Sequence, residues 1–178
     1  NYPYDYWNLW INNDCDSGND NIECMNTIAA ENDVVIFKHC YPGADIEADT
    51  GNPDITSSIK SLENYKLQYR ALRDMMDSYT DNNFIVWTLV PRHRLATNSE
   101  NAQRAKEFVD WVKTDFLTED SRDHANIAIF DFWKEVADDD NYLKYDYEIS
   151  HSLSDSHPNT LANQTVGPIF SDFITYVI

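Results

Sequence analysis

Apolar residues along this chain form three short, nearly unbroken runs, at 33–37, 84–90 and 126–132. Runs of this kind, without regular polar alternation, are typical of a parallel sheet that is covered on both faces. The three runs therefore predict three buried parallel strands.

Two amphipathic stretches separate these runs, and a third follows the last of them. Residues from about 57 to 79 carry apolar side chains at steps of three and four, which predicts a helix with one apolar face. The second helix should begin at Thr97, which opens a Thr-x-x-Glu capping box. The third should begin near Thr160, with Asn159 or Thr160 as its cap, and Pro168 should kink or restart it.

Strands that alternate with helices predict an α/β fold, with a parallel sheet, helices on both faces and right-handed crossovers. The length of 178 residues suits one domain with its own core. We expect a single domain over 1–178, in which 1–32 is irregular and 33–178 forms the α/β core. Ligand sites in such sheets lie beyond the carboxyl ends of the strands.

The chain is strongly acidic, with a formal net charge of −18 and an isoelectric point near 4.3. Such a surface repels nucleic acid and anionic membranes, so neither is expected as a partner. A solvated acidic face accounts for this charge, and cation-rich surroundings are the alternative. No apolar run reaches the roughly 20 residues of a membrane span, and no signal peptide opens the sequence. We therefore treat the chain as either a mature protein or a fragment.

The cysteines bear on the compartment. Cys15 and Cys24 bracket a polar loop and are placed to form a short disulfide, with two free thiols as the alternative, and Cys40 is left over. A Cys15–Cys24 bridge would favour an oxidising, extracellular location. Asn163 begins an Asn-Gln-Thr glycosylation sequon, which points toward a secreted glycoprotein.

Basic and imidazole groups follow the predicted strands in this otherwise acidic chain. His39 comes after the first strand, and Arg92 and His93 come after the second. Because the carboxyl ends of parallel strands meet at one rim, we expect these side chains and Asn159 to contact an anionic or polar ligand. The alternative is structural: the histidine packs in the rim and the arginine pairs with surface acids.

Asp155 and His157 lie two residues apart on a loop just ahead of the last predicted helix. An Asp that accepts a hydrogen bond from a His fixes the tautomer of the ring, as hydrolases do when they prepare a general base. Asp155 and His157 are therefore our catalytic candidates. A brace for the last helix is the structural alternative.

Residues 33–178 resemble the SGNH, or GDSL-type, hydrolase superfamily. The strand at 33–37, with its Lys-His-Cys-Tyr-Pro exit, resembles the third strand of that family, and 84–91 and 126–132 resemble the fourth and fifth. The Asp-Ser-His-Pro-Asn segment at 155–159 resembles the Asp–His block. The sequence is especially similar to a branch of uncharacterised secreted proteins with a Lys-x-Cys-x-Pro turn.

The resemblance implies a flavodoxin-like three-layer sandwich and an esterase of carbohydrate or small esters, with His157 as base and Asp155 as its orienting partner. The sequence departs from the family in four places. Asp155 precedes the His by two residues instead of three, and the Gly-x-Asn-Asp oxyanion block, the Gly-Asp-Ser nucleophile block and the first two strands are not found. Ser17 is a poor substitute nucleophile, because it lies too close to the first strand for a parallel crossover.

Without those two strands, the strand at 34–37 would form a bare sheet edge, and bare edges invite pairing. We expect another segment to pair with it. The candidates are an upstream piece of a longer precursor, residues 1–12 folding back, or a strand from a neighbouring subunit in self-association.

One weak metal candidate is present. Asp14, Asp16 and Asp20 alternate as the oxygen ligands of a calcium loop do. Later ligand positions of that loop hold Gly and Met, so a solvated loop is the preferred interpretation. No other cofactor is expected.

Two functions remain open. The first is a secreted, non-catalytic domain used for binding or assembly. Aromatic residues at 2–10 and Tyr142, Tyr145 and Tyr147 would suit an interface or carbohydrate stacking. The alternative is an extracellular esterase whose Ser nucleophile lies on an upstream segment. The first is preferred, because no nucleophile is recognised in the chain.

Overall fold

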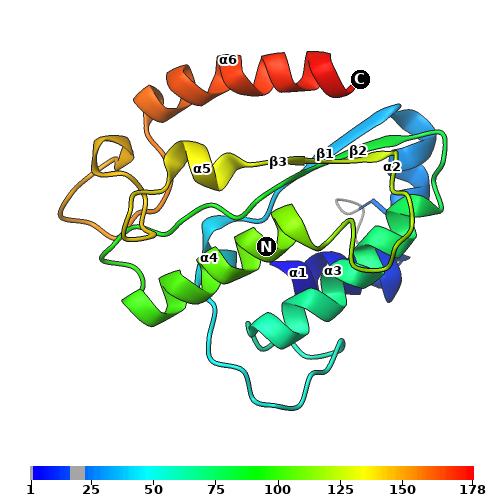
Figure 1. Cartoon of the computed structure of the whole chain (residues 1–178), viewed down its shortest axis with the longest axis horizontal. Helices are drawn as coiled ribbons and strands as arrows, with labels where there is room; N and C mark the ends of the chain where they lie inside the picture. The colour runs from blue at the N-terminus through cyan, green and yellow to red at the C-terminus, as the bar shows by residue number, and fades with distance from the viewer. Residues whose placement is uncertain (1, 17–22) are drawn as a thin grey trace.

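Three parallel strands form the centre of the molecule, in the order β1-β2-β3 (Figure 1). The computed structural model describes residues 2–16 and 23–178. Strand β1 spans Val34–Phe37, β2 spans Asn83–Trp87 and β3 spans Ile127–Phe130. Both neighbouring pairs are parallel. The predicted α/β class with a parallel sheet is confirmed, and the arrangement is consistent with a flavodoxin-like kind of fold.

Helices and short helical turns connect and cover these strands. The α-helices of the described residues are α1 (Pro3–Tyr6), α2 (Met25–Glu31), α3 (Leu62–Asp77), α4 (Ser99–Thr114), α5 (Phe132–Val136) and α6 (Thr160–Val177). A π-helical turn at Trp7–Ile11 follows α1. Short 3-10 turns lie at Asp14–Asp16, Tyr41–Ala44 and Tyr145–Tyr147.

Helices α3 and α4 lie on one face of the sheet (Figure 1). The apolar sides of these helices and of the strands enclose large, fully buried aromatic residues: Tyr65, Tyr69, Phe84, Phe108 and Phe116. The rings of Tyr69 and Phe108 meet edge to face, with their centroids 4.9 Å apart. Full burial of a side chain such as Phe stabilises a protein by roughly 1.5–3 kcal/mol relative to exposure, so this layer forms the main hydrophobic core.

Helix α6 covers the opposite face of the sheet (Figure 1). Phe170 on α6 contacts Trp87 and Phe130, with ring centroids 4.5 and 4.7 Å apart. Ile36 in β1 remains 45% exposed. The expected helices on both faces are therefore present, but α6 lies over β2 and β3 and leaves part of β1 open.

Capping side chains set where the helices begin. Helix α3 begins at Leu62, later than predicted, because the Ser61 side chain accepts the backbone N–H of Asn64. The prediction of Thr97 as the cap of α4 is wrong: Asn98 accepts the N–H of Asn101 at 2.8 Å. The hydroxyl of Thr97 instead donates to Asp45 at 2.7 Å.

Helix α6 runs without a break from Thr160 to Val177 and includes Pro168. The predicted restart is therefore not observed. Pro168 lies on an exposed part of the helix, where water can bind the carbonyl group that a proline leaves without a partner.

The prediction of an irregular segment over 1–32 is wrong for its described part, which contains α1, the π-helical turn and α2. Aromatic side chains explain this ordering. Tyr6 lies against Phe37 with ring centroids 5.4 Å apart, Trp10 lies 5.8 Å from Phe37, and Tyr2 lies 6.3 Å from Tyr65. These contacts bury the segment on the α3 side of the sheet. Residues 2–12 therefore add no strand to β1, which corrects the expectation that the segment 1–12 folds back onto it.

The outer edge of β1 carries no paired strand within the described part of the chain. Val35 and Phe37 are buried beneath the edge, while Ile36 is partly exposed. Pairing with an upstream segment or a neighbouring subunit stays a prediction. Among the described helices, none combines the length and apolar character needed to span a bilayer.

Candidate functional site

Asp155 and His157 form a hydrogen-bonded pair on the loop that precedes α6. Nδ1 of His157 lies 2.7 Å from Oδ1 of Asp155, and the backbone N–H of His157 donates to the same oxygen at 3.0 Å. These two hydrogen bonds, the backbone one first, hold the pKa of the Asp155 carboxyl below its usual value. A proton on Nδ1 leaves Nε2 as the basic nitrogen of the neutral ring.

His157 lines a cavity of about 400 Å³ between the carboxyl ends of the strands and α6. The apolar part of the wall comes from the strand exits and from α6: Trp87, Val90, Phe132, Pro158, Val166 and Phe170. The rest of the wall is Lys38, Cys40, Tyr41, His157, Asn163 and Gly167. The ring of Tyr41 meets that of His157 edge to face, with centroids 4.5 Å apart. We call this cavity the α6 pocket.

The α6 pocket has no Ser or Thr on its wall within the part of the chain that the structure describes. Cys40 is partly exposed, and it is the free cysteine of the described residues. Ser156, beside the His–Asp pair, is fully buried, and its hydroxyl accepts the backbone N–H of His93 at 2.9 Å. Ser156 thus braces the loop and is not placed to attack a ligand. Ser17 lies outside the described residues.

His39 does not reach the pocket. Its side chain is fully buried among the rings of Tyr6, Phe37 and Tyr69, and neither ring nitrogen has a hydrogen-bond partner among the described residues. Burial lowers the pKa of His39 to about 3, so the ring is neutral at physiological pH. Successive side chains of an extended segment point to opposite sides. Lys38 consequently faces the pocket while His39 faces the α3 side.

Arg92 and His93 are engaged inside the protein. Nη1 of Arg92 lies 2.8 Å from Oδ2 of Asp45. His93 is fully buried; its Nδ1 accepts the backbone N–H of Leu95 at 3.0 Å. That bond places the ring proton on Nε2, which lies 3.0 Å from the carbonyl oxygen of Ser150. Both residues therefore support the loops around the site and do not line its pocket.

The buried carboxylate of Glu148 contacts both Arg94 and the half-exposed ring of His151. Arg94 donates to it at 2.8 Å, and the ring nitrogen Nδ1 of His151 lies 2.8 Å from it. Burial alone would raise the pKa of Glu148, but the hydrogen bonds from His151 and Arg94 outweigh burial and hold the pKa below its usual value. Sequence analysis missed this group, because no local pattern marks an acid that will be buried.

Asn159 is the cap of α6. Its Oδ1 accepts the N–H of Ala162 at 3.2 Å, and its Nδ2 donates to the carbonyl oxygens of Asp146 and Glu148 at 2.9 and 3.0 Å. This use of the side chain is structural. Asn163, the sequon residue, is exposed in the first turn of α6 and lines the pocket.

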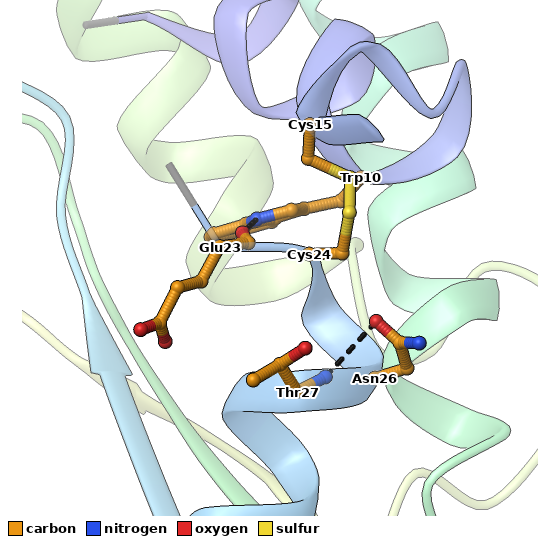
Figure 2. The surroundings of a disulfide bond; sticks show 6 residues. All are labelled: Trp10, Cys15, Glu23, Cys24, Asn26 and Thr27. Atoms are coloured by element: carbon orange, nitrogen blue, oxygen red, sulfur yellow. Dashed lines mark hydrogen bonds between the residues drawn. A yellow bond between two sulfur atoms is a disulfide. The ribbon is translucent and has the colours of Figure 1, made fainter. Parts of the chain in front are cut away.

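Cys15 and Cys24 are joined by a disulfide in the N-terminal segment (Figure 2). The ring of Trp10 lies next to the disulfide, and its Nε1 donates to the carbonyl oxygen of Glu23 at 3.3 Å (Figure 2). The bridge thus fastens α2 to the aromatic segment before it.

The calcium candidate falls partly outside the described residues, because Asp20 lies there. Asp14 and Asp16 end a short 3-10 turn, and Asp14 accepts a hydrogen bond from the Asn8 amide at 3.0 Å. Among residues 2–16 and 23–178, no group of three His, Cys, Asp or Glu side chains is arranged to hold a metal ion. Calcium binding by the acidic loop stays a prediction.

Two other histidines lie away from the α6 pocket. His124 is buried, with ring nitrogens 2.9 Å from Asp77 and 3.1 Å from Asp120. His151 is about half exposed and stacks on Tyr145 with a centroid separation of 3.6 Å. Tyr145 and Tyr147 line a second hollow beside Arg94. Neither histidine lines the α6 pocket.

Comparisons of the chain with protein-family models, with curated proteins and with solved structures found no match.

Proposed function

We propose that this chain is a secreted domain of the SGNH-hydrolase type that binds a small ligand in the α6 pocket and has no turnover of its own. The observation that carries the proposal is the composition of the pocket wall. The wall includes His157, which Asp155 orients, beside apolar side chains, but it has no serine or threonine hydroxyl within the described residues.

The chemistry of acyl transfer supports this choice. A serine hydrolase needs its hydroxyl within hydrogen-bond reach of the imidazole that takes the proton. Ser156 is committed to the backbone N–H of His93, so it does not fulfil this condition. A His–Asp pair without a serine or threonine nucleophile still offers a polar anchor beside an apolar cavity, which is the usual composition of a small-molecule site.

The Cys15–Cys24 bond supports the proposed extracellular compartment. Disulfides persist mainly in oxidising compartments, so the bond supports secretion. Glycosylation at Asn163 would fit the same location. A glycan there would stand at the pocket, because Asn163 is one of its wall residues.

A second candidate is an extracellular esterase, and the open edge of β1 favours it. A parallel strand added at this edge would end at the same rim as His157, since sites of parallel sheets form beyond the carboxyl ends. Such a strand could bring the missing Ser to the 2.7 Å His157–Asp155 pair. The proposed source of this strand is an upstream segment or a neighbouring subunit. Assembly through the edge of β1 is therefore part of the proposal.

The test measures turnover and binding in one preparation of the secreted protein. We expect no labelling by a fluorophosphonate probe, no hydrolysis of p-nitrophenyl esters, and ligand signals in an NMR screen of small esters, carboxylic acids and sugars. Labelling that is lost in His157→Asn but kept in His151→Asn would establish the esterase instead. A screen without any bound ligand would contradict the binding proposal.

A further inference from the structure

We infer that the α6 pocket takes the apolar acyl or aryl group of a ligand whose head is a carboxylate. This inference rests on the proposed function, and it adds the chemical class of the ligand and the orientation in which it binds.

Aromatic side chains form one end of the pocket. Trp87 contacts Phe132 and Phe170, with ring centroids 4.7 and 4.5 Å apart, so the three rings support one another. Val90 and Val166 extend this apolar wall. An apolar group placed here leaves water for a cavity that is already formed, which is the main source of affinity for small ligands.

Polar side chains form the other end, where the exit of β1 meets the start of α6. Tyr41 contacts His157, and Lys38 and Asn163 belong to the same wall. The two ends thus differ in chemistry. A ligand with an apolar tail and a polar head matches both.

The charge of the wall selects the head group. The chain has 31 Asp and Glu residues against 13 Lys and Arg residues, yet no acidic side chain lines the α6 pocket within the described part of the chain. The formal charge on the wall is that of Lys38. A carboxylate is therefore favoured over an ammonium head group, which Lys38 would repel.

The size of the pocket limits the tail. Its volume of about 400 Å³ lies near the lower end of the usual range for ligand sites, about 300–1,000 Å³. A medium-length acyl chain or one aromatic ring suits this space. Acetate is too small to reach the aromatic end.

Gly167 provides a direct way to fill the pocket. It lies on the wall, and a Cβ atom added there meets no other atom within 4 Å. A leucine at this position is expected to occupy part of the pocket. Because Pro168 follows directly, a side chain at 167 also crowds the proline ring, so the melting temperature of Gly167→Leu is measured beside its ligand binding. Gln164 is exposed on the same helix and absent from the wall, so Gln164→Leu is the matched control.

Cys40 supplies a readout that needs no turnover. It lies on the pocket wall, and Cys15 and Cys24 are protected from alkylation by their disulfide. The rate at which iodoacetamide alkylates Cys40 is measured with octanoate, acetate or octylamine present. Isothermal titration of the same ligands measures binding independently of the thiol.

We expect octanoate to bind and to slow alkylation of Cys40, and acetate and octylamine to bind at least about tenfold more weakly. Gly167→Leu should lose octanoate binding by at least about tenfold, while Gln164→Leu should match the wild type. If octylamine bound as tightly as octanoate, the inferred preference for an anionic head group would be wrong. If acetate bound as tightly as octanoate, the inferred role of the apolar tail would be wrong. Unchanged octanoate binding in Gly167→Leu would show that octanoate does not bind in the α6 pocket.

These outcomes are separate from the test of the proposed function. A pocket that binds another class in the NMR screen, and not octanoate, contradicts the inference alone. Octanoate binding together with His157-dependent turnover contradicts the absence of catalysis and leaves the ligand class intact.

Discussion

At the scale of the residue, burial decides what each histidine can do. His39 follows β1 directly, and His157 lies on the loop before α6. His39 is enclosed by aromatic rings, whereas the side chain of His157 is 59% exposed. The enclosed ring has lost its basicity, with a pKa of about 3, and the exposed ring is oriented by Asp155. Only the second is placed for chemistry with a ligand.

The low pKa of His39 predicts acid sensitivity. Above the unfolded pKa of 6.5 the ring is neutral in both states and adds no pH dependence. Below 6.5 the unfolded chain takes up a proton that the native chain refuses, so this group removes about 1.4 kcal/mol of stability per pH unit, until its folded pKa of about 3 is reached.

His39→Phe should therefore gain stability relative to the wild type as the pH falls from 6.5 to 4. Urea unfolding at several pH values measures this difference. His157→Gln, at an exposed ring, is the control and should not change the slope in the same way. A constant difference between His39→Phe and wild type across this range would contradict the buried, neutral ring.

At the scale of the element, α6 is held by its first turn. Asn159 caps the helix and ties it to the Asp146–Glu148 segment. The same helix supplies much of the pocket wall, so its position sets the shape of the site. Its anchoring is thus a structural condition for ligand binding.

Asn159→Ala should destabilise the protein by about 1–3 kcal/mol, because it removes the cap, a hydrogen bond to the part-buried carbonyl group of Glu148 and one to the exposed carbonyl group of Asp146. Asn159→Asp keeps the acceptor for the Ala162 N–H but lacks the N–H donor. Its free energy of unfolding should therefore lie between those of the wild type and Asn159→Ala. Amide hydrogen exchange is the measurement, and protection should drop in α6 more than in α4. Equal loss in both helices would show a general effect instead of a local anchor.

At the scale of the whole molecule, charge and the open sheet edge act together. A net charge of −18 repels within the molecule and between copies of it. Repulsion of this kind opposes self-association through β1, and screening by salt weakens it.

Added salt should therefore raise the melting temperature. Between about 0.01 and 0.15 M NaCl the Debye length falls from about 30 to about 8 Å, so repulsion between exposed carboxylates is screened over progressively shorter distances. Thermal unfolding in CaCl₂, at the same ionic strength as in NaCl, also tests whether the acidic loop with Asp14 and Asp16 binds calcium. Stabilisation beyond that of NaCl, and lost in Asp14→Asn, would show calcium binding; equal curves would favour screening alone.

The strands and helices themselves follow from local patterns. Apolar runs placed all three strands within a few residues, and periodic apolar positions placed α3, α4 and α6. The errors have local causes as well. Asn98 competes with Thr97 for one cap, and the aromatic residues of 1–12 form helical turns only because the α3 side of the sheet is there to cover them.

The sequence by itself therefore determined the α/β class, the parallel sheet and the Asp155–His157 pair, since each depends on residues that are close in the chain. Only the tertiary structure decided which side chains share the α6 pocket. Lys38 and Cys40 point toward α6 while His39 points into the core, and Trp87 meets Phe170 from the other end of the chain. The pleat of the strand and the packing of α6 set these directions, and neither is visible in residue spacing alone.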